Sequence, residues 1–281
     1  MARVLELPAD REGRAGASRP VDARASLRRR LARARDLVVT LSESDFRVRY
    51  GRGRLRLLKW LVDPFALVGV YLVLVALVLD RGGPAPGLSI ACAVVPFQLV
   101  MGSVINSLGA ITGRASIILN MAFPRELLPL ASVLTESVAF VASLGLIVIM
   151  MAIYAVAPTA AVLWLPVVLL VNLAVAVSLV YPGALVGIHF QELRPFAVSF
   201  VRTLFFLAPG LIALNQIPEA TGDLVRLNPL TGLFEAYREV LLYGSSPAAW
   251  MLLVPLVISA VLVAIFVPIY RREQDQLAKV V

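Results

Sequence analysis

The titratable side chains inside the apolar part of this sequence are few, and they do not cluster as an enzyme's acid and base would. Glu136 and Arg202 each lie within an apolar run, and His189 is the only histidine. A metal at His189 would lack further histidine or cysteine ligands, so we predict an ordinary histidine there. The sequence has no G-x-x-x-x-G-K-[ST] phosphate-binding loop. We therefore predict no catalytic residue, no metal and no cofactor in this chain; if ATP drives it, a second polypeptide must hydrolyse the ATP.

Glu136 and Arg202 are placed at similar depth by the prolines that precede them. Glu136 follows Pro129 and Arg202 follows Pro195, each by about two helical turns, which is about 10 Å along a helix from the same surface. Equal depth permits an ion pair. Two interpretations stay open. In the first, Arg202 snorkels to the membrane surface and Glu136 is hydrogen-bonded to a neighbouring helix. In the second, both residues line the inner mouth of a conduit and meet an anionic headgroup or a polar substrate.

The elements that must position these residues are membrane helices. The chain has 281 residues, of which 59% are hydrophobic and 16% are charged, and its mean hydropathy of +0.86 is far above that of a soluble domain. A helix needs about 20 apolar residues to cross the hydrocarbon core. We therefore predict an all-α integral membrane protein whose domain at 60–270 contains six transmembrane helices, at 60–80, 88–111, 130–156, 163–188, 196–215 and 250–270.

The basic excess of the chain is confined to its start and sets the predicted orientation. The net charge is +8; residues 1–63 hold sixteen Lys/Arg against eight Asp/Glu, whereas the remainder holds ten of each. Because Lys and Arg concentrate in cytoplasmic loops, we predict that both termini are cytoplasmic, including a tail at 271–281. Arg125 and Arg194 then face the cytoplasm as well, and Arg226 and Arg238 lie on the outer side.

Residues 1–59 divide into two parts. Residues 1–26 have scattered Pro, Gly, Ala and Arg without a period, which is typical of a disordered basic tail. In residues 27–59, apolar residues recur among arginines at helical spacing, which predicts cytoplasmic amphipathic helices on the membrane surface; they are Leu31, Ala34, Val38 and Leu41. A solvated tail is the alternative. Nucleic acid is not expected as a partner because aromatic residues for base stacking are too few.

The predicted outer segment at 216–249 holds a helix that is too short to cross. Asn228 is a candidate N-cap and Pro229 suits the first helical position. Apolar residues follow at helical spacing, but the run covers only about 15 residues and contains Glu235 and Arg238. We predict a re-entrant helix that dips into, or lies on, the outer leaflet.

The segment "FPRELLP" at 123–129 interrupts the apolar sequence on the predicted cytoplasmic side. A simple loop would be polar, yet this segment combines apolar residues with Arg125 and Glu126. A short amphipathic helix of this kind suits a groove of a partner protein. Packing against the chain's own inner surface is the alternative.

Three motifs together resemble the membrane subunit of type-2 ABC exporters. They are "DFRVRYGRGRLRLLKWLVDPF" before the first predicted span, "NMAFPRELLPLASVLTESV" between the second and third, and "LNPLTGLFEAYREVLLYG" before the last. The resemblance covers about residues 42–272 and points to the polysaccharide branch, which exports O-antigen, teichoic-acid, capsule and mycobacterial galactan chains. It implies a homodimer in the bacterial inner membrane, surrounded by membrane lipids. Two copies of an ABC ATPase subunit would bind ATP and Mg.

The resemblance also implies roles for particular residues. The ATPase-coupling helix would comprise Phe123, Pro124, Arg125, Glu126, Leu127 and Leu128. Aromatic candidates for the conduit lining are Phe97, Phe140, Phe200, Phe205 and Phe206, although helix packing explains each of them as well. The outer gate would comprise Asn228, Pro229, Phe234, Tyr237, Arg238 and Tyr243. The basic run at the inner surface has the charge to hold a pyrophosphate headgroup, with Glu136 and Arg202 at the inner mouth; its residues are Arg47, Arg49, Arg52 and Arg54.

The function that the resemblance implies is export of a polyprenyl-pyrophosphate-linked polysaccharide by a transport subunit that is not itself an enzyme. One alternative is a type-2 ABC exporter of a drug or lipid, which would act on small amphiphiles. Another is a membrane-embedded glycan transferase. That enzyme would need acidic or histidine groups clustered at one face of the membrane, and Glu136, Glu192, Glu235 and Glu239 are scattered instead.

Overall fold

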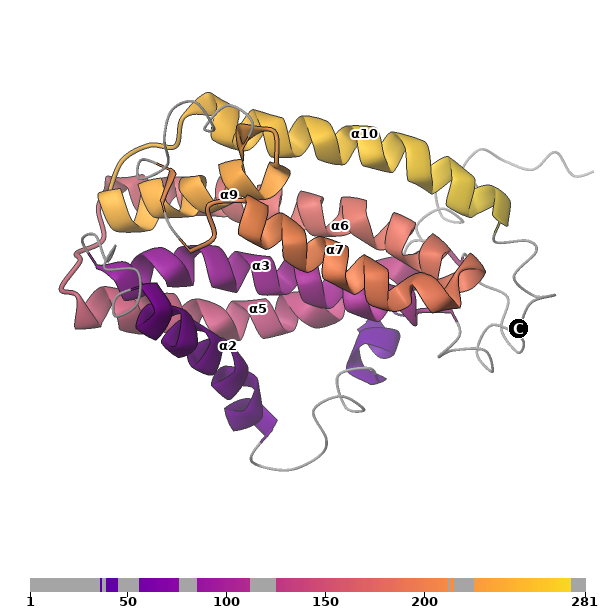
Figure 1. Ribbon diagram of the computed structural model, residues 1–281, viewed down its shortest axis with the longest axis horizontal. Helices are drawn as coiled ribbons and strands as arrows, with labels where there is room; N and C mark the ends of the chain where they lie inside the picture. The colour runs from indigo at the N-terminus through magenta and orange to yellow at the C-terminus, as the bar shows by residue number, and fades with distance from the viewer. Residues whose placement is uncertain are drawn as a thin grey trace, which may run out of the picture.

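The computed structural model describes residues 36, 39–44, 56–75, 85–111, 125–211, 213–214 and 225–273, and every regular element in these residues is a helix. The prediction of an all-α protein is confirmed for this part of the chain. Figure 1 shows the longer helices lying side by side in one elongated bundle. The elements are α2 (Arg56–Val73), α3 (Pro86–Leu108), α5 (Leu127–Ile153), η3 (Ala160–Trp164), α6 (Leu165–His189), η4 (Gln191–Leu193), α7 (Arg194–Leu207), α9 (Pro229–Arg238), η6 (Glu239–Tyr243) and α10 (Ala249–Glu273).

Four helices are long and apolar enough to cross a membrane, which supports the prediction of a multi-pass membrane protein. They are Pro86–Leu108, Leu127–Ile153, Ala160–His189 and Ala249–Glu273, and they match the predicted spans at 88–111, 130–156, 163–188 and 250–270. The predicted spans at 60–80 and 196–215 fall on α2, with 18 residues, and α7, with 14. At 1.5 Å per residue α7 is about 21 Å long, shorter than a hydrocarbon core of about 30 Å.

Helix α3 is the centre of the bundle, with 18 of its 23 residues buried. Small residues allow α6 to approach it closely. A Cβ atom at Gly187 of α6 would lie 2.7 Å from the carbonyl carbon of Leu108, and one at Gly183 would collide with the hydroxyl of Ser107. Without a hydrophobic driving force between helices in lipid, such backbone contact is the usual basis of helix association.

The bundle has two ends that the contacts define. At one, the Arg125 end, α5 begins, α6 ends at His189 and α10 ends at Glu273; Arg271 there pairs with Glu126. At the other, the Arg238 end, α3 begins and α9 lies beside the start of α10. Figure 1 shows α10 (yellow) running along the bundle with its first turns beside α9.

Helix α9 begins at Pro229 and is buried from Leu230 to Arg238. Asn228 precedes it as the N-cap, and its Oδ1 accepts a hydrogen bond from the Leu230 amide at 3.0 Å. Both features match the prediction. A single π turn, η6, follows, and Gly244 ends it with φ of 68°, a left-handed conformation that favours glycine.

The described part of the predicted amphipathic segment at 27–59 includes a helical stretch at 39–44 that rests on α5. Leu41 and Ser42 are buried, whereas Val39 is exposed. The Ser42 hydroxyl donates a hydrogen bond to the Ala131 carbonyl at 3.2 Å. This stretch is therefore anchored to the first turns of α5, close to the Arg125 end.

Candidate functional site

Part of the predicted site residues lie outside the described residues. They are Phe123 and Pro124 of the coupling segment and the candidate headgroup residues Arg47, Arg49, Arg52 and Arg54. The roles that the resemblance implies for them stay predictions. The remaining candidates lie in α3, in α5 and the turn before it, in α7, and in the segment 228–243 that contains α9.

The described part of the coupling segment is a turn that leads directly into α5. Arg125 and Glu126 form the turn, and the Leu128 amide donates to the Arg125 carbonyl at 3.1 Å. Leu127 and Leu128 are already the first residues of α5, which begins three residues before the predicted span at 130. Leu128 is fully buried, so the coupling candidates combine a half-buried charged turn with an apolar anchor.

Glu136 lies between α5 and α3 at the Arg125 half of the bundle. Its side chain is 5% exposed, and its Oε1 accepts a hydrogen bond from Asn106 Nδ2 at 2.6 Å. The carboxyl group rests over Gly102, where a Cβ atom would come within 2.6 Å of the Glu136 carboxyl carbon. Arg202 is exposed on α7. Among the described residues no ion pair joins Glu136 to Arg202. In this conformation Glu136 is instead hydrogen-bonded to the neighbouring helix α3.

The predicted conduit aromatics separate into buried and exposed residues. Phe140 is buried, and Phe205 is buried at the centre of an aromatic cluster. The ring of Phe205 lies 4.6 Å from Phe97, 5.7 Å from Phe234 and 5.9 Å from Tyr71, measured between centroids. These contacts join α7 to α3, α9 and α2.

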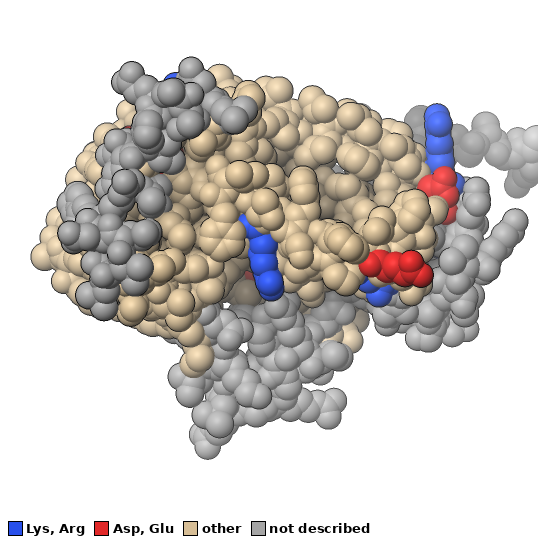
Figure 2. Space-filling view, in the orientation of Figure 1, with Lys and Arg blue, Asp and Glu red and all other residues tan. Residues whose placement is uncertain are grey.

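The exposed aromatics lie along one side of α7. Phe196, Phe200 and Phe206 are 70%, 63% and 58% exposed. Arg202 and Thr203 are exposed among them, and the Thr203 hydroxyl donates to the Ser199 carbonyl at 2.9 Å. On the face drawn in Figure 2 the described surface is mostly uncharged, and charged side chains gather mainly near one end. The α7 face is therefore both aromatic and polar.

The predicted gate residues hold α9 inside the bundle. Phe234, Tyr237 and Arg238 have no exposed surface, whereas Tyr243 is 40% exposed. The Tyr237 hydroxyl accepts a hydrogen bond from Asn172 Nδ2 of α6 at 3.3 Å. Asn228 also uses its Nδ2, which donates to the Leu204 carbonyl of α7 at 2.7 Å. Asn228 thus links the start of α9 to the last turns of α7.

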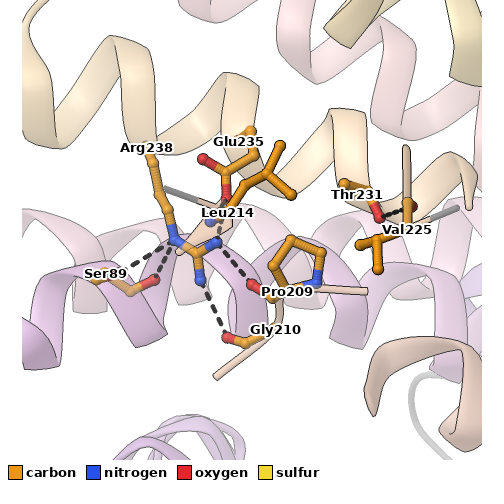
Figure 3. Close-up of polar contacts among 8 residues, drawn as sticks. All are labelled: Ser89, Pro209, Gly210, Leu214, Val225, Thr231, Glu235 and Arg238. Atoms are coloured by element: carbon orange, nitrogen blue, oxygen red, sulfur yellow. Dashed lines mark hydrogen bonds and ion pairs between the residues drawn. The ribbon is translucent and has the colours of Figure 1, made fainter. Parts of the chain in front are cut away.

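Arg238 is the centre of a polar network that ties three segments together (Figure 3). Its Nε donates to the Ser89 hydroxyl at 3.0 Å and to the Ser89 carbonyl at 3.2 Å, at the start of α3. Nη1 donates to the Pro209 carbonyl at 2.6 Å, and Nη2 donates to the Gly210 carbonyl at 3.1 Å, just after α7. Nη1 also pairs with Glu235 Oε1 at 2.7 Å.

Glu235 completes this network and was not among the predicted site residues. Its Oε1 accepts a hydrogen bond from the Leu214 amide at 3.0 Å as well as the bond from Arg238. The spacing of Glu235 and Arg238, three residues apart on a helix, is a signal in the sequence that predicts their contact. No local signal identifies Ser89, which lies 149 residues from Arg238 in the chain.

His189 contacts a carboxylate at the Arg125 end. Its Nε2 lies 3.3 Å from Glu273 Oε2 at the end of α10. Within the described residues, no group of three or more His, Cys, Asp and Glu side chains is placed to hold a metal ion.

Comparison with known proteins identifies three curated permease relatives, although no protein-family model matches the chain. Two O-antigen export system permease proteins RfbA from Klebsiella pneumoniae are 26% identical over 213 and 212 residues, which are 75% and 74% of this chain and 82% and 81% of the relatives. The O-antigen export system permease protein RfbA of Myxococcus xanthus is 26% identical over 253 residues, 89% of this chain and 97% of the relative. The predicted resemblance to a permease subunit, a transport subunit rather than an enzyme, is confirmed by these relatives.

Proposed function

We propose that this chain, as the permease subunit of an ABC-2 type polysaccharide exporter, moves a polyprenyl-pyrophosphate-linked polysaccharide from the cytoplasm across the bacterial inner membrane. The three relatives are named as O-antigen export permeases, which favours a glycan over a drug or lipid as cargo. Two copies of the chain form the conduit, and two copies of a separate ATPase subunit bind ATP and Mg and supply the energy.

The exposed face of α7 is the observation that carries the proposal. Phe200 and Phe206 project from this helix, and Arg202 and Thr203 are exposed among them. An exposed arginine within an apolar helix is costly against lipid and suits a watery cavity or a polar ligand. Aromatic faces next to polar groups suit sugar rings that must slide past. We therefore place α7 of each copy along the conduit, with α2 beside it through the Tyr71–Phe205 contact.

The predicted orientation assigns a task to each end of the bundle. The Arg125 end faces the cytoplasm, where segment 123–128 meets the ATPase subunit, and the basic run at 47–54 meets the pyrophosphate headgroup. The Arg238 end faces outward, where α9 and η6 form a re-entrant gate. In this proposal α2 and α7, with the residues that flank them, complete the count of six spans.

Affinity purification from native membranes tests the proposal. The tagged chain is isolated, co-purifying subunits are identified, and ATP hydrolysis is measured; the same is done with Arg125→Glu. A stoichiometric ABC ATPase that is lost or uncoupled in the variant supports the proposal. A folded chain that brings down no ATPase would refute it.

Substitution of the exposed α7 aromatics tests the conduit separately. The double variant Phe200→Ala/Phe206→Ala should lower export of the lipid-linked glycan while the complex with the ATPase stays intact. Val141→Ala is the matched control, since Val141 is an exposed apolar residue of α5 with 65% of its surface accessible. Equal export by the double variant and the control would exclude α7 as conduit lining.

A further inference from the structure

The last turn of α10 is bonded to the predicted coupling segment. Tyr270 is fully buried, and its hydroxyl donates a hydrogen bond to the Arg125 carbonyl at 3.2 Å. This carbonyl belongs to the turn that precedes α5. A residue of the C-terminal helix, 145 positions away in the chain, therefore helps to fix the backbone of that turn.

The residue after Tyr270 contacts the same turn through its charge. Arg271 Nη2 lies 2.8 Å from Glu126 Oε2, with the arginine side chain 59% exposed and the glutamate 26% exposed. Two successive residues of α10 thus hold two successive residues of the turn. One contact is a partly buried hydrogen bond to the backbone, and the other is a partly exposed ion pair between side chains.

The end of α10 is itself held in place by α6. The Tyr270 ring packs edge-on against Tyr181, with centroids 5.7 Å apart and an interplanar angle of 74°. Glu273 lies 3.3 Å from His189 at the end of α6. Because the ring is anchored in the core, the hydroxyl of Tyr270 has a fixed position from which to bond to Arg125.

The other end of α10 packs against α9. A Cβ atom at Gly232 of α9 would lie 2.7 Å from the Met251 carbonyl oxygen of α10, so the two backbones are in direct contact there. Helix α10 has 25 residues, which gives a length of about 37 Å. One continuous helix therefore contacts the turn at Arg125 and Glu126 at one end of the bundle and α9 at the other.

We propose that Tyr270 and Arg271 are positioning residues for the coupling segment, and that α10 is the strut that links this segment to α9. This inference rests on the proposed function, in which segment 123–128 meets the ATPase. Movement of the coupling segment shifts the end of α10 through the two contacts, and the helix carries the shift to α9. Loss of the contacts would leave ATP hydrolysis intact and lower the amount of glycan exported per ATP.

A charge swap tests the Arg271 contact in the full complex of permease and ATPase in native membranes. Arg271→Glu and Glu126→Arg should each lower export per ATP by about two- to fivefold, the range that an exposed ion pair supports. The double variant Arg271→Glu/Glu126→Arg restores an opposite-charge pair and should recover most of the loss. Arg272→Gln is the matched control, because Arg272 is the exposed neighbour with no ion pair among the described residues.

Tyr270→Phe tests the second contact, because it keeps the ring against Tyr181 and removes only the hydroxyl. We expect export per ATP to fall by about two- to tenfold, with unchanged co-purification of the ATPase and only a small fall in the melting temperature. Wild-type export per ATP in Tyr270→Phe, or no recovery in the charge swap, would overturn the inference. If no ATPase subunit co-purified with the wild-type chain, the proposed function would fail instead. Failure of the proposed function is therefore distinguishable from failure of this inference.

Discussion

Arg238 and Glu235 form an ion pair inside the bundle, with Nη1 and Oε1 2.7 Å apart and the side chains 0% and 6% exposed. Removing one partner leaves the other charge buried without compensation, which costs about 3–5 kcal/mol. We therefore expect Arg238→Met and Glu235→Gln each to lower the melting temperature of the detergent-solubilised protein markedly. Thermal unfolding measured by loss of helical circular dichroism checks this.

A double variant separates the contribution of the Glu235–Arg238 ion pair to stability from the contribution of side-chain packing. Glu235→Met/Arg238→Met removes both charges, so its loss of stability should be clearly smaller than the sum of the losses of the single variants Glu235→Met and Arg238→Met. Arg272→Met controls for loss of an exposed arginine and should leave the melting temperature unchanged. Strict additivity in the double variant would contradict the ion pair.

Gly102 and Gly145 differ in what surrounds them, so substitution by alanine should destabilise the protein at Gly102 and stabilise it at Gly145. A Cβ at Gly102 meets the Glu136 carboxyl group, whereas nothing lies within 4 Å of one at Gly145 of α5. Gly102→Ala should cost about 1–3 kcal/mol. Gly145→Ala should stabilise the helix by up to about 1 kcal/mol. Unfolding of both variants in the same detergent makes the comparison.

The close contact between a Cβ atom at position 102 and the Glu136 carboxyl group also predicts which second substitution relieves the cost of Gly102→Ala. Glu136→Ala removes the carboxyl group, so Gly102→Ala should cost less in the Glu136→Ala background than in the wild type. An equal cost in both backgrounds would mean that the Glu136 carboxyl does not rest over Gly102.

Asn228 has two hydrogen bonds that two substitutions can separate. Its Oδ1 caps α9 and its Nδ2 donates to the Leu204 carbonyl of α7. Asn228→Ala loses both and should cost about 1–2 kcal/mol or more. Asn228→Asp keeps the capping oxygen but replaces the amide donor with a carboxylate oxygen that cannot bond to the Leu204 carbonyl. We expect a melting temperature between those of the wild type and Asn228→Ala; a value as low as that of Asn228→Ala would contradict the cap.

The start of α9 could be predicted from the sequence, and the end of α7 could not be predicted correctly from hydropathy. Asn228 and Pro229 predict a helix start because an N-cap and a first-turn proline act within a few residues of one another. The apolar run at 196–215 is long enough to span, yet α7 ends at Leu207 because Ala208 is extended before Pro209. The carbonyls of Pro209 and Gly210 then accept bonds from Arg238 instead of continuing the helix. Pro209 is visible in the sequence as a candidate helix end, but nothing in the sequence near α7 indicates that Arg238 binds the carbonyls that follow.

The contact of Glu136 shows a second limit of the sequence. Spacing from Pro129 predicts how deep this residue lies along its helix, but not the direction in which it points. Helix rotation is decided by packing, here the closeness of α5 to Gly102 and Asn106 of α3. Equal depth with Arg202 was therefore compatible with an ion pair and did not require one.

Substitution of a buried and of an exposed phenylalanine of α7 should affect stability and transport differently. Phe205 is 2% exposed and contacts the rings of Phe97, Tyr71 and Phe234, so Phe205→Ala should cost about 3–5 kcal/mol. Phe200 is 63% exposed, so Phe200→Ala should leave the melting temperature nearly unchanged. Melting temperature and glycan export are measured on both variants. Because export by Phe200→Ala should fall without loss of stability, a drop in its melting temperature comparable to that of Phe205→Ala would place Phe200 in the core and contradict its assignment to the conduit.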